Sequence, residues 1–428
     1  MTTRRRSPHR AEPRRPAPHR AELPAPTRSE GSGANVEPGE LTAVLARPLE
    51  RALGRGHPWI WRDAFRSLDA RAGQVVTVLD RQARFVARGL CDAGPIGVRV
   101  LTTDAREPID AALFERRMAS AAELRARVLP EATNAYRLLH GEGDRLPGVV
   151  CDVYAEHAVL KFDGLGALAW RATIERALRP VLSSLGVGTL IVRSGRRGEE
   201  QVELGWGRLP EGLLLVEEHG MKLQVDPCRG QKTGLFLDHR ESRWRVRALA
   251  QGARLLNLYG YTGGFSIAAG LGGAEQVDTV DLAAPALELA EQSWALNGLD
   301  PARQRVHARD AFDFLGQAST ERRQWDLVVA DPPSFAPKDA SVPQALKSYR
   351  RLHEGCLRVL RPGGLYLAAS CSSHVGREAF AETLNDAAAP SGRTLQLVDS
   401  WGAGPDHPRL LGFPEGDYLK VLLVRALP

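Results

Sequence analysis

One segment of the sequence combines an acidic residue, two prolines and an aromatic residue. It reads Asp331-Pro332-Pro333-Ser334-Phe335 and directly follows the apolar run 327–330. Two prolines stiffen a turn and remove two N–H donors, so Asp331 and nearby carbonyl groups can be presented to the edge of a planar base. Phe335 can stack on that base. These residue types in this order indicate a binding site for a nucleobase.

A cysteine stands in a second polar segment, Ser370-Cys371-Ser372-Ser373-His374, which follows the apolar run 365–370. A thiolate that adds to C6 of cytosine makes C5 nucleophilic enough to take a methyl group. This chemistry also needs a group that stabilises charge around N3 and N4 of the base. Cys371 and Asp331 are the candidates for these two roles. The alternative is that Cys371 is a small buried residue at the end of a strand.

An apolar run that includes Asn257 leads into a glycine-rich turn, Tyr259-Gly260-Tyr261-Thr262-Gly263-Gly264. Glycines allow a backbone to approach a ligand closely at the carboxyl end of a strand. The spacing is not GxGxxG, which argues against a dinucleotide pyrophosphate site. The turn is therefore a candidate cofactor loop, and a plain strand-to-helix turn is the alternative.

Three further aspartates are candidates for cofactor contact. Asp281 ends the run 277–281, where a carboxylate can accept both ribose hydroxyls of NAD or of S-adenosylmethionine (SAM). Asp310 follows the next run and can meet an adenine amino group, or it only caps the helix after it. Asp238 lies in the polar segment 230–240 with Lys232 and Arg240, whose cations can bind a carboxylate or a phosphate. Capping of a turn is the alternative role for Asp238.

The elements that would position these residues begin near residue 226, where apolar runs alternate with amphipathic segments. Strands are expected over 255–259, 277–281, 305–308, 327–330 and 365–370, with helices such as 285–296 and 343–360 between them, and then over 395–398 and 418–424 without a helix. This alternation predicts an α/β fold with a parallel sheet, helices on both faces and an antiparallel final strand. Ligands bind at the carboxyl ends of such strands, so Gly260, Asp281, Asp331 and Cys371 are expected on one rim.

Residues 40–102 are expected to form a small β-rich module, because short alternating runs are separated by turn residues. The runs are 41–45, 74–79, 83–90 and 97–101. Arg55, His57 and Trp59 lie in a mixed basic and aromatic segment and are candidate RNA contacts. The alternative is that Trp59 and Trp61 fill the core of the barrel.

The middle of the chain predicts an α/β segment without a recognisable catalytic module. Helices are expected over 108–130 and 170–185, a hairpin of 149–154 with 158–162, and strands over 190–193 and 213–217.

Composition narrows the class of protein. The chain has 428 residues, enough for two or three domains, and a formal net charge of +6, which fits a polyanionic partner. Residues 1–38 hold eight arginines and four glutamates among many prolines, which predicts a disordered basic tail. The five cysteines form no CxxC pair, so we expect neither a zinc site nor a disulfide framework. With no apolar run of membrane-spanning length and no signal-peptide pattern, we expect a cytoplasmic protein.

Together these residues resemble the bacterial ribosomal RNA large subunit methyltransferase I family, whose members make 5-methylcytosine in 23S rRNA. The resemblance runs from about residue 41 to the C-terminus. The segments that carry it are Arg55–Trp61, Gly141–Val150, Gly230–Arg240, Leu256–Ser266, Asp331–Phe335, Ser370–Ser372, Asp406–Pro408 and Pro414–Lys420.

The resemblance implies a domain organisation, a cofactor and partners. After the tail (1–39) it implies a PUA-like RNA-binding domain over 40–105, a middle α/β domain over 106–220 and a class I SAM-dependent methyltransferase domain with a seven-stranded sheet over 221–428. It implies 23S rRNA or a ribosomal particle as the partner and no metal. A homodimer is compatible with the exposed edge of a PUA-like barrel.

The resemblance also implies roles for individual residues. SAM would lie over the Gly260–Gly264 loop, with its ribose on Asp281, its adenine near Asp310 and its amino acid end near Asp238 or Arg240. Cys371 matches the nucleophile position.

Two departures from the family pattern touch the substrate rim: Ser334 replaces the usual lysine, and Ser373-His374 replaces a Gly-Leu pair. Three alternatives therefore stay open. In the first, the chain is a guanine N-methyltransferase in which Cys371 is structural. In the second it is an RNA-binding assembly factor without activity, and in the third it is an NAD dehydrogenase. The spacing of the glycine loop and the Pro-Pro turn disfavour the last of these.

Overall fold

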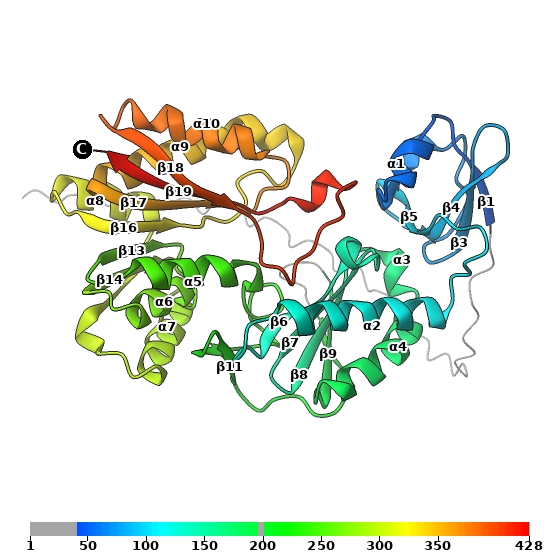
Figure 1. Ribbon diagram of the computed structural model, residues 1–428, viewed down its shortest axis with the longest axis horizontal. Coiled ribbons are helices and arrows are strands. Elements are labelled where there is room, and N and C mark those ends of the chain that lie inside the picture. The colour runs from blue at the N-terminus through cyan, green and yellow to red at the C-terminus, as the bar shows by residue number, and fades with distance from the viewer. Residues whose placement is uncertain (1–40, 196–200, 428) are drawn as a thin grey trace, which may run out of the picture. The chain divides into compact units, whose positions relative to one another are not determined.

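The computed structural model describes residues 41–195 and 201–427. The basic tail expected over residues 1–39 lies outside these ranges. The described residues form four sheets, three of them with five or seven strands (Figure 1). We propose that these three larger sheets mark three domains, with boundaries near residues 105 and 220.

The first sheet is mixed and has the strand order β1-β3-β4-β5-β2. Its elements are β1 (Leu41–Val44), α1 (Glu50–Gly54), β2 (Trp59–Trp61), β3 (Val75–Leu79), β4 (Phe85–Cys91) and β5 (Ile96–Thr102). Ile60 is fully buried in its core, whereas Trp61 is exposed and Trp59 is half-buried. The alternative in which Trp59 and Trp61 fill the core is therefore wrong, because alternation along a three-residue strand puts the middle side chain inside.

The second sheet has the order β10-β9-β8-β7-β6. Its elements are α2 (Ala111–Val128), β6 (Ala135–His140), β7 (Val149–Tyr154), β8 (His157–Phe162), α3 (Leu165–Leu168), α4 (Arg171–Ser184), β9 (Thr189–Ser194) and β10 (Gln201–Trp206). The β7–β8 hairpin and both long helices match the sequence-based expectation. Strands β6 and β10 were not predicted; β10 lies at the edge of the sheet with no buried side chain, so it lacks an apolar signal.

A small hairpin links this part of the chain to the last sheet. It pairs β11 (Leu214–Glu218) with β12 (Met221–Val225) through a tight turn in which His219 and Gly220 both have positive φ. Two positive φ values are the mark of a type I′ turn, which matches the twist of the strands that it joins. The buried side of the hairpin joins the core of the final domain through Val216, Leu223 and Val225.

The last sheet has seven strands in the order β15-β14-β13-β16-β17-β19-β18. The strands are β13 (Arg254–Leu258), β14 (Gln276–Asp281), β15 (Gln304–Ala308), β16 (Trp325–Ala330), β17 (Leu360–Ser370), β18 (Thr394–Trp401) and β19 (Lys420–Leu427). Strands β13 to β17 are parallel, and β19 inserts antiparallel between β17 and β18. The expected α/β fold with an antiparallel final strand is confirmed.

Helices cover both faces of this sheet (Figure 1). They are α5 (Arg240–Leu249), α6 (Gly264–Leu271), α7 (Ala284–Leu296), α8 (Ala311–Thr320), α9 (Val342–Val359) and α10 (Arg377–Ala388). Alternate residues of β13 divide between the two cores: Leu255 packs with α5, α6 and α7, and Leu256 packs with α8, α9 and α10. Burial on both faces explains why most residues of the central strands are apolar.

A buried carboxylate, Asp406, ties the last domain to the middle one. Arg240 donates to both of its carboxylate oxygens, at 2.9 and 2.7 Å. The backbone N–H of Arg137 donates to the same carboxylate, and Arg125 donates to the Asp406 carbonyl oxygen. Burial alone would raise the pKa of Asp406, but His407 and Arg240 outweigh burial and hold its pKa well below the ordinary value.

Within the described ranges, no helix is long and apolar enough to span a bilayer.

We expect Asp406→Asn to lower the free energy of unfolding by about 3–5 kcal/mol, because it leaves the Arg240 guanidinium buried without its charged partner. Because the pKa of Asp406 is depressed, its stabilisation is present above about pH 4 and is lost as the pH falls further. Urea unfolding at pH 7 measures the first effect, and a series of unfolding curves at pH values falling below 4 measures the second. The control is Asp399→Asn, which breaks the half-exposed ion pair with Arg245 on the same helix and should change stability by about 1 kcal/mol or less. Equal losses in the two variants would contradict this account.

Candidate active site

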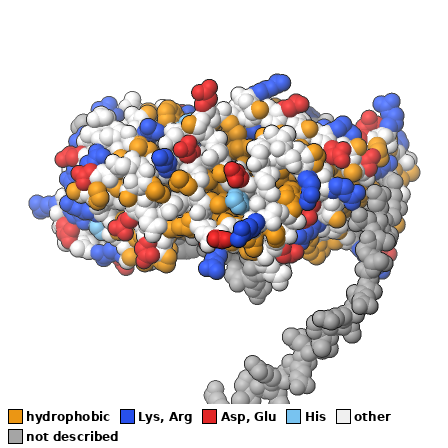
Figure 2. All heavy atoms as spheres, turned by 90° about the horizontal axis from the view of Figure 1, so that it is seen from below, with side chains coloured by type: hydrophobic (Ala, Val, Ile, Leu, Met, Phe, Trp, Pro, Cys, Tyr) orange, Lys and Arg blue, Asp and Glu red, His pale blue; other side chains and the backbone are white. Residues whose placement is uncertain are grey.

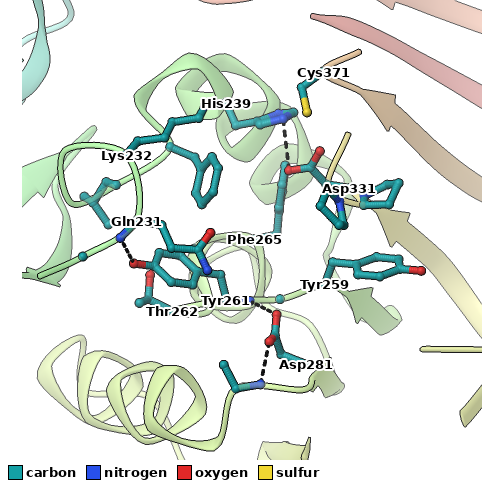
Figure 3. Close-up of a pocket in the computed structure, with 18 of the residues that line it drawn as sticks. Gln231, Lys232, His239, Tyr259, Tyr261, Thr262, Phe265, Asp281, Asp331 and Cys371 are labelled. Atoms are coloured by element: carbon teal, nitrogen blue, oxygen red, sulfur yellow. Dashed lines mark hydrogen bonds and ion pairs between the residues drawn. The ribbon is translucent and has the colours of Figure 1, made fainter. Parts of the chain in front are cut away.

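A cavity of about 800 Å³ opens at the carboxyl ends of strands β13, β14, β16 and β17 (Figure 3). Twelve of the residues singled out in the sequence line it: Lys232, Asp238, Tyr259, Gly260, Tyr261, Thr262, Asp281, Asp310, Asp331, Pro332, Pro333 and Cys371. They come from six separate segments of the chain. The parallel sheet brings five of these segments together because each lies at the end of a strand or just after it, on the same edge, whereas Lys232 and Asp238 come from the segment before α5.

The turn after β13 has an unusual backbone. Tyr259 and Tyr261 have φ values of 60° and 46°, and Gly263 has 77°. Left-handed backbone is uncommon for residues other than glycine and is often found where a loop holds a ligand. A Cβ atom on Gly260 would lie 2.5 Å from a methyl group of Thr279, so only glycine fits there. The loop can therefore lie flat at the floor of the cavity.

Asp281 and Asp310 are both held by backbone N–H groups. Asp281 accepts from Tyr261 and Ala283, one N–H on each carboxylate oxygen, as Figure 3 shows. One oxygen of Asp310 accepts from Phe312 and Asp313 and so caps α8. Asp310 thus caps a helix and lines the cavity at the same time.

Asp238 carries an oxygen that has no hydrogen-bond partner. Its Oδ2 accepts from the Lys232 ammonium at 2.9 Å and from the Tyr418 hydroxyl at 2.8 Å, while the buried Oδ1 accepts from no described group. Burial would raise the pKa of Asp238, but Lys232 and the neighbouring His239 and His407 hold it well below the ordinary value. An ionised carboxylate with an unused oxygen in a cavity wall is suited to bind a cation.

Cys371 and Asp331 lie at the other end of the cavity, beside His239 (Figure 3). The Nε2 atom of His239 lies 3.1 Å from one oxygen of Asp331. Burial raises the pKa of the Cys371 thiol to about 11; the Asp331 carboxylate adds to the rise and Lys232 opposes it. At this pKa the cysteine is a neutral thiol at pH 7.

Four of the candidate residues lie near the cavity but do not line it. Arg240 is fully buried and bound to Asp406, so its guanidinium is already used. Asn257 lies beneath the loop and donates to Ser266, and Gly263 packs against Ala290. The Phe335 ring packs against Tyr349 at a centroid distance of 4.9 Å. In this structure Phe335 is therefore not placed to stack on a base.

The candidate RNA contacts of the first sheet pack against a loop between β18 and β19. The Trp59 ring lies 4.6 Å from the Phe413 ring and donates its N–H to Glu142. The Nε2 atom of His57 lies 3.5 Å from a carboxylate oxygen of Glu415. The backbone of Arg55 packs closely on Gly412: a Cβ atom placed on Gly412 would lie 2.2 Å from the carbonyl oxygen of Arg55. These contacts fasten the segment within the protein, and RNA binding by these residues stays a prediction.

Sequence reasoning missed further cavity residues, among them His239, Arg243 and Ser334. His239 and Arg243 line the wall, and Arg243 is paired with the buried Glu218. His239 lies within the polar segment 230–240 and could have been named with its neighbours. Ser334 was noted only as a departure from the family; its hydroxyl lies 2.9 Å from that of Ser372, which links the Asp331 segment to the cysteine segment.

Comparisons with known proteins agree with this geometry. A profile of the S-adenosylmethionine-dependent methyltransferase family matches residues 165–425, and a PUA-like domain matches residues 43–103. A protein of Klebsiella pneumoniae named ribosomal RNA large subunit methyltransferase I is 36% identical over 392 residues, which cover 90% of this chain and 98% of the relative. An Escherichia coli protein of the same name is 35% identical over 391 residues, covering 90% of this chain and 99% of that protein.

This chain belongs to the ribosomal RNA large subunit methyltransferase I family. Two crystal structures are similar over 90% of the chain with a TM-score of 0.81. One is a methyltransferase in complex with SAH, 25% identical and matched over 99% of its length. The other is a SAM-dependent methyltransferase from Streptococcus mutans, 24% identical and matched over its full length. The expected fold, with a PUA-like N-terminal domain, and the expected cofactor SAM are confirmed.

The charges that line the cavity suit SAM, the cofactor of this ribosomal RNA large subunit methyltransferase I family member. SAM carries a sulfonium and an ammonium group, and four aspartates line the wall. We propose that Asp281 binds the ribose, that Asp310 lies near the adenine and that the unused Oδ1 of Asp238 accepts from the ammonium group. Arg240, bound to Asp406, does not share the last role.

We expect Asp281→Ala to weaken binding of S-adenosylhomocysteine about 10- to 100-fold, because it removes hydrogen bonds to a charged acceptor and loosens the loop at Tyr261. Isothermal titration calorimetry measures the change. The matched control is Asp300→Ala, which removes an aspartate that caps a short helix outside the cavity. Unchanged affinity in Asp281→Ala, or an equal loss in the control, would contradict the assignment.

Proposed function

We propose that this protein methylates C5 of a cytosine in large-subunit ribosomal RNA, through a covalent adduct between Cys371 and C6 of the base. The observation that carries the proposal is the position of Cys371 and Asp331 in one cavity with the glycine-rich cofactor loop. The names of the relatives supply the substrate class: they are ribosomal RNA large subunit methyltransferases. We assign 23S rRNA or a ribosomal particle as the partner.

The residues divide the reaction between them. Cys371 Sγ, as thiolate, bonds to C6 of cytosine, which breaks the C5–C6 double bond and places its electron pair at C5. Asp331 accepts from the N4 amino group and so holds the base by its edge. Bound SAM supplies the methyl group that C5 takes up. Loss of the C5 proton to water and departure of the Cys371 thiolate then restore the aromatic ring.

The raised pKa of Cys371 constrains when this reaction starts. A thiol with a pKa of about 11 is almost wholly protonated at pH 7, and only the thiolate attacks. Asp331 is one cause of the rise, because its negative charge opposes a second one nearby. We propose that the base, by binding to Asp331, screens this charge and so lowers the pKa of the thiol.

The PUA-like domain supports an RNA partner, because domains of this kind are the RNA-binding part expected in the family. Pairing of two chains is an additional proposal that rests only on the edges of the first sheet. A guanine N-methyltransferase would use the same cofactor loop but would not need Cys371. An assembly factor without activity is disfavoured by the aspartates that line the cofactor cavity.

We expect Cys371→Ala to abolish 5-methylcytidine formation, because the nucleophile is removed while the cofactor loop remains. The measurement is mass spectrometry of nucleosides from undermethylated 23S rRNA after incubation with enzyme and labelled SAM. Cys228→Ala is the matched control: Cys228 is also partly exposed and free, but it does not line the cavity. The control should keep its activity. Methylguanosine as the product, with Cys371→Ala still active, would favour the guanine enzyme.

A further inference from the structure

The turn that holds Cys371 is fixed on both sides by buried hydroxyl groups. The Tyr349 hydroxyl on α9 lies 2.9 Å from the hydroxyls of both Ser370 and Ser372. The Ser372 hydroxyl also contacts Ser334. The residues on either side of the cysteine are therefore hydrogen-bonded to a helix on one face of the sheet. Tyr349 is a neutral phenol at pH 7, and burial raises its pKa further.

Lys420 holds the same turn from the neighbouring strand. It begins β19 and pairs with Ser370, the last residue of β17. Its side chain is 1% exposed, and its ammonium donates to the carbonyl oxygens of Ser372 and Tyr418. Two carbonyl groups satisfy hydrogen bonds but do not neutralise a charge. Among the residues that the structure describes, no carboxylate forms an ion pair with Lys420.

The charged groups around Lys420 are few. Burial lowers its pKa to about 8; Cys371 and Asp417 act against this fall, and Arg377 adds to it. Around the thiol itself, Asp331 and Asp238 disfavour the thiolate and Lys232 favours it. A buried cation thus contacts the turn that carries the nucleophile, and it does not line the cavity.

We propose that Lys420 is a positioning residue for Cys371, whose buried ammonium fixes the nucleophile turn and favours the thiolate over the thiol. The catalytic value of this role rests on the proposed function, because addition to C6 of cytosine requires a thiolate. Its effect on the thiol does not depend on RNA and can be measured without it.

Linkage makes the two charges support each other. The thiolate raises the pKa of Lys420, so the ammonium must lower the pKa of Cys371 by the same amount. The ammonium is present below about pH 8 and is lost as the pH rises further. The advantage that Lys420 gives to the thiolate is therefore greatest near neutral pH and declines above pH 8.

Alkylation of Cys371 by iodoacetamide tests the proposal on the full-length protein. The thiol loses its proton to the buffer, and the thiolate sulfur then bonds to the reagent carbon and expels iodide, so the rate follows the thiolate fraction. The background is Cys228→Ala, and mass spectrometry of the Cys371 peptide gives the rate from pH 6.5 to 10. The variants are Lys420→Met, Lys420→Arg and Tyr349→Phe, each checked for folding by thermal unfolding.

We expect Lys420→Met to slow alkylation of Cys371 about tenfold near pH 7, the effect of a change of about one unit in the pKa of the thiol. The difference from the background should shrink above pH 8, where Lys420 itself loses its charge. Lys420→Arg should restore most of the rate. Tyr349→Phe loosens the same turn without removing a charge, and its alkylation rates should match those of the background protein. If Lys420→Met proves unfolded, the comparison of Lys420→Arg with the background decides, because arginine keeps its charge above pH 8 and should make alkylation there faster than in the background.

An unchanged rate near pH 7 in a folded Lys420→Met would overturn the proposal and reduce Lys420 to a structural role. An equal loss of rate in Tyr349→Phe would do the same, because it would show that rigidity alone controls the thiol. The result is distinct from a failure of the proposed function. A protein that makes methylguanosine but shows the expected rate changes would keep the lysine effect and lose the cytosine mechanism.

Discussion

Parallel strands of one sheet all end on the same edge, and this constraint places the cofactor loop, Asp281, Asp331 and Cys371 of the candidate active site together. The cofactor loop follows β13, Asp281 ends β14, Asp331 follows β16 and Cys371 follows β17. None of these residues is close to another in sequence. The surrounding helices and the buried strands keep the edge in register, so the chemistry depends on a sheet that cannot shift by one residue without turning its side chains to the other face.

The loop between β18 and β19 is the second element on which the arrangement depends. Asp406 within it binds Arg240, and Phe413 and Glu415 contact Trp59 and His57. The buried bidentate pair of Asp406 and Arg240 requires a fixed geometry, because a shift of either partner leaves a buried charge unpaired and destabilises the fold. The surface charges show no such arrangement: on the face drawn in Figure 2, basic and acidic side chains are interspersed.

The sequence predicted the seven strands of the last sheet and twelve of the residues that line the cavity, because apolar runs and the polar residues after them are local signals. It could not decide between Asp238 and Arg240, which are two positions apart in one motif. The direction of the Arg240 side chain depends on Asp406, which lies 166 positions further along the chain. The packing of Phe335 and Trp59 could not be predicted for the same reason: Tyr349 and Phe413, whose rings they contact, are remote in sequence. Lys420 belongs to the family segment Pro414–Lys420, but only the pairing of β17 with β19 places it beside the turn that holds Cys371.

The central claim is a covalent bond between Cys371 and C6 of cytosine. RNA that contains 5-fluorocytidine at the target tests it most directly, because fluorine cannot leave C5 as a proton does and the adduct persists. With SAM present, we predict a protein–RNA species whose mass includes one added methyl group, with the cross-link on the Cys371 peptide. Absence of any such species, under conditions in which unmodified RNA is methylated, would contradict the mechanism.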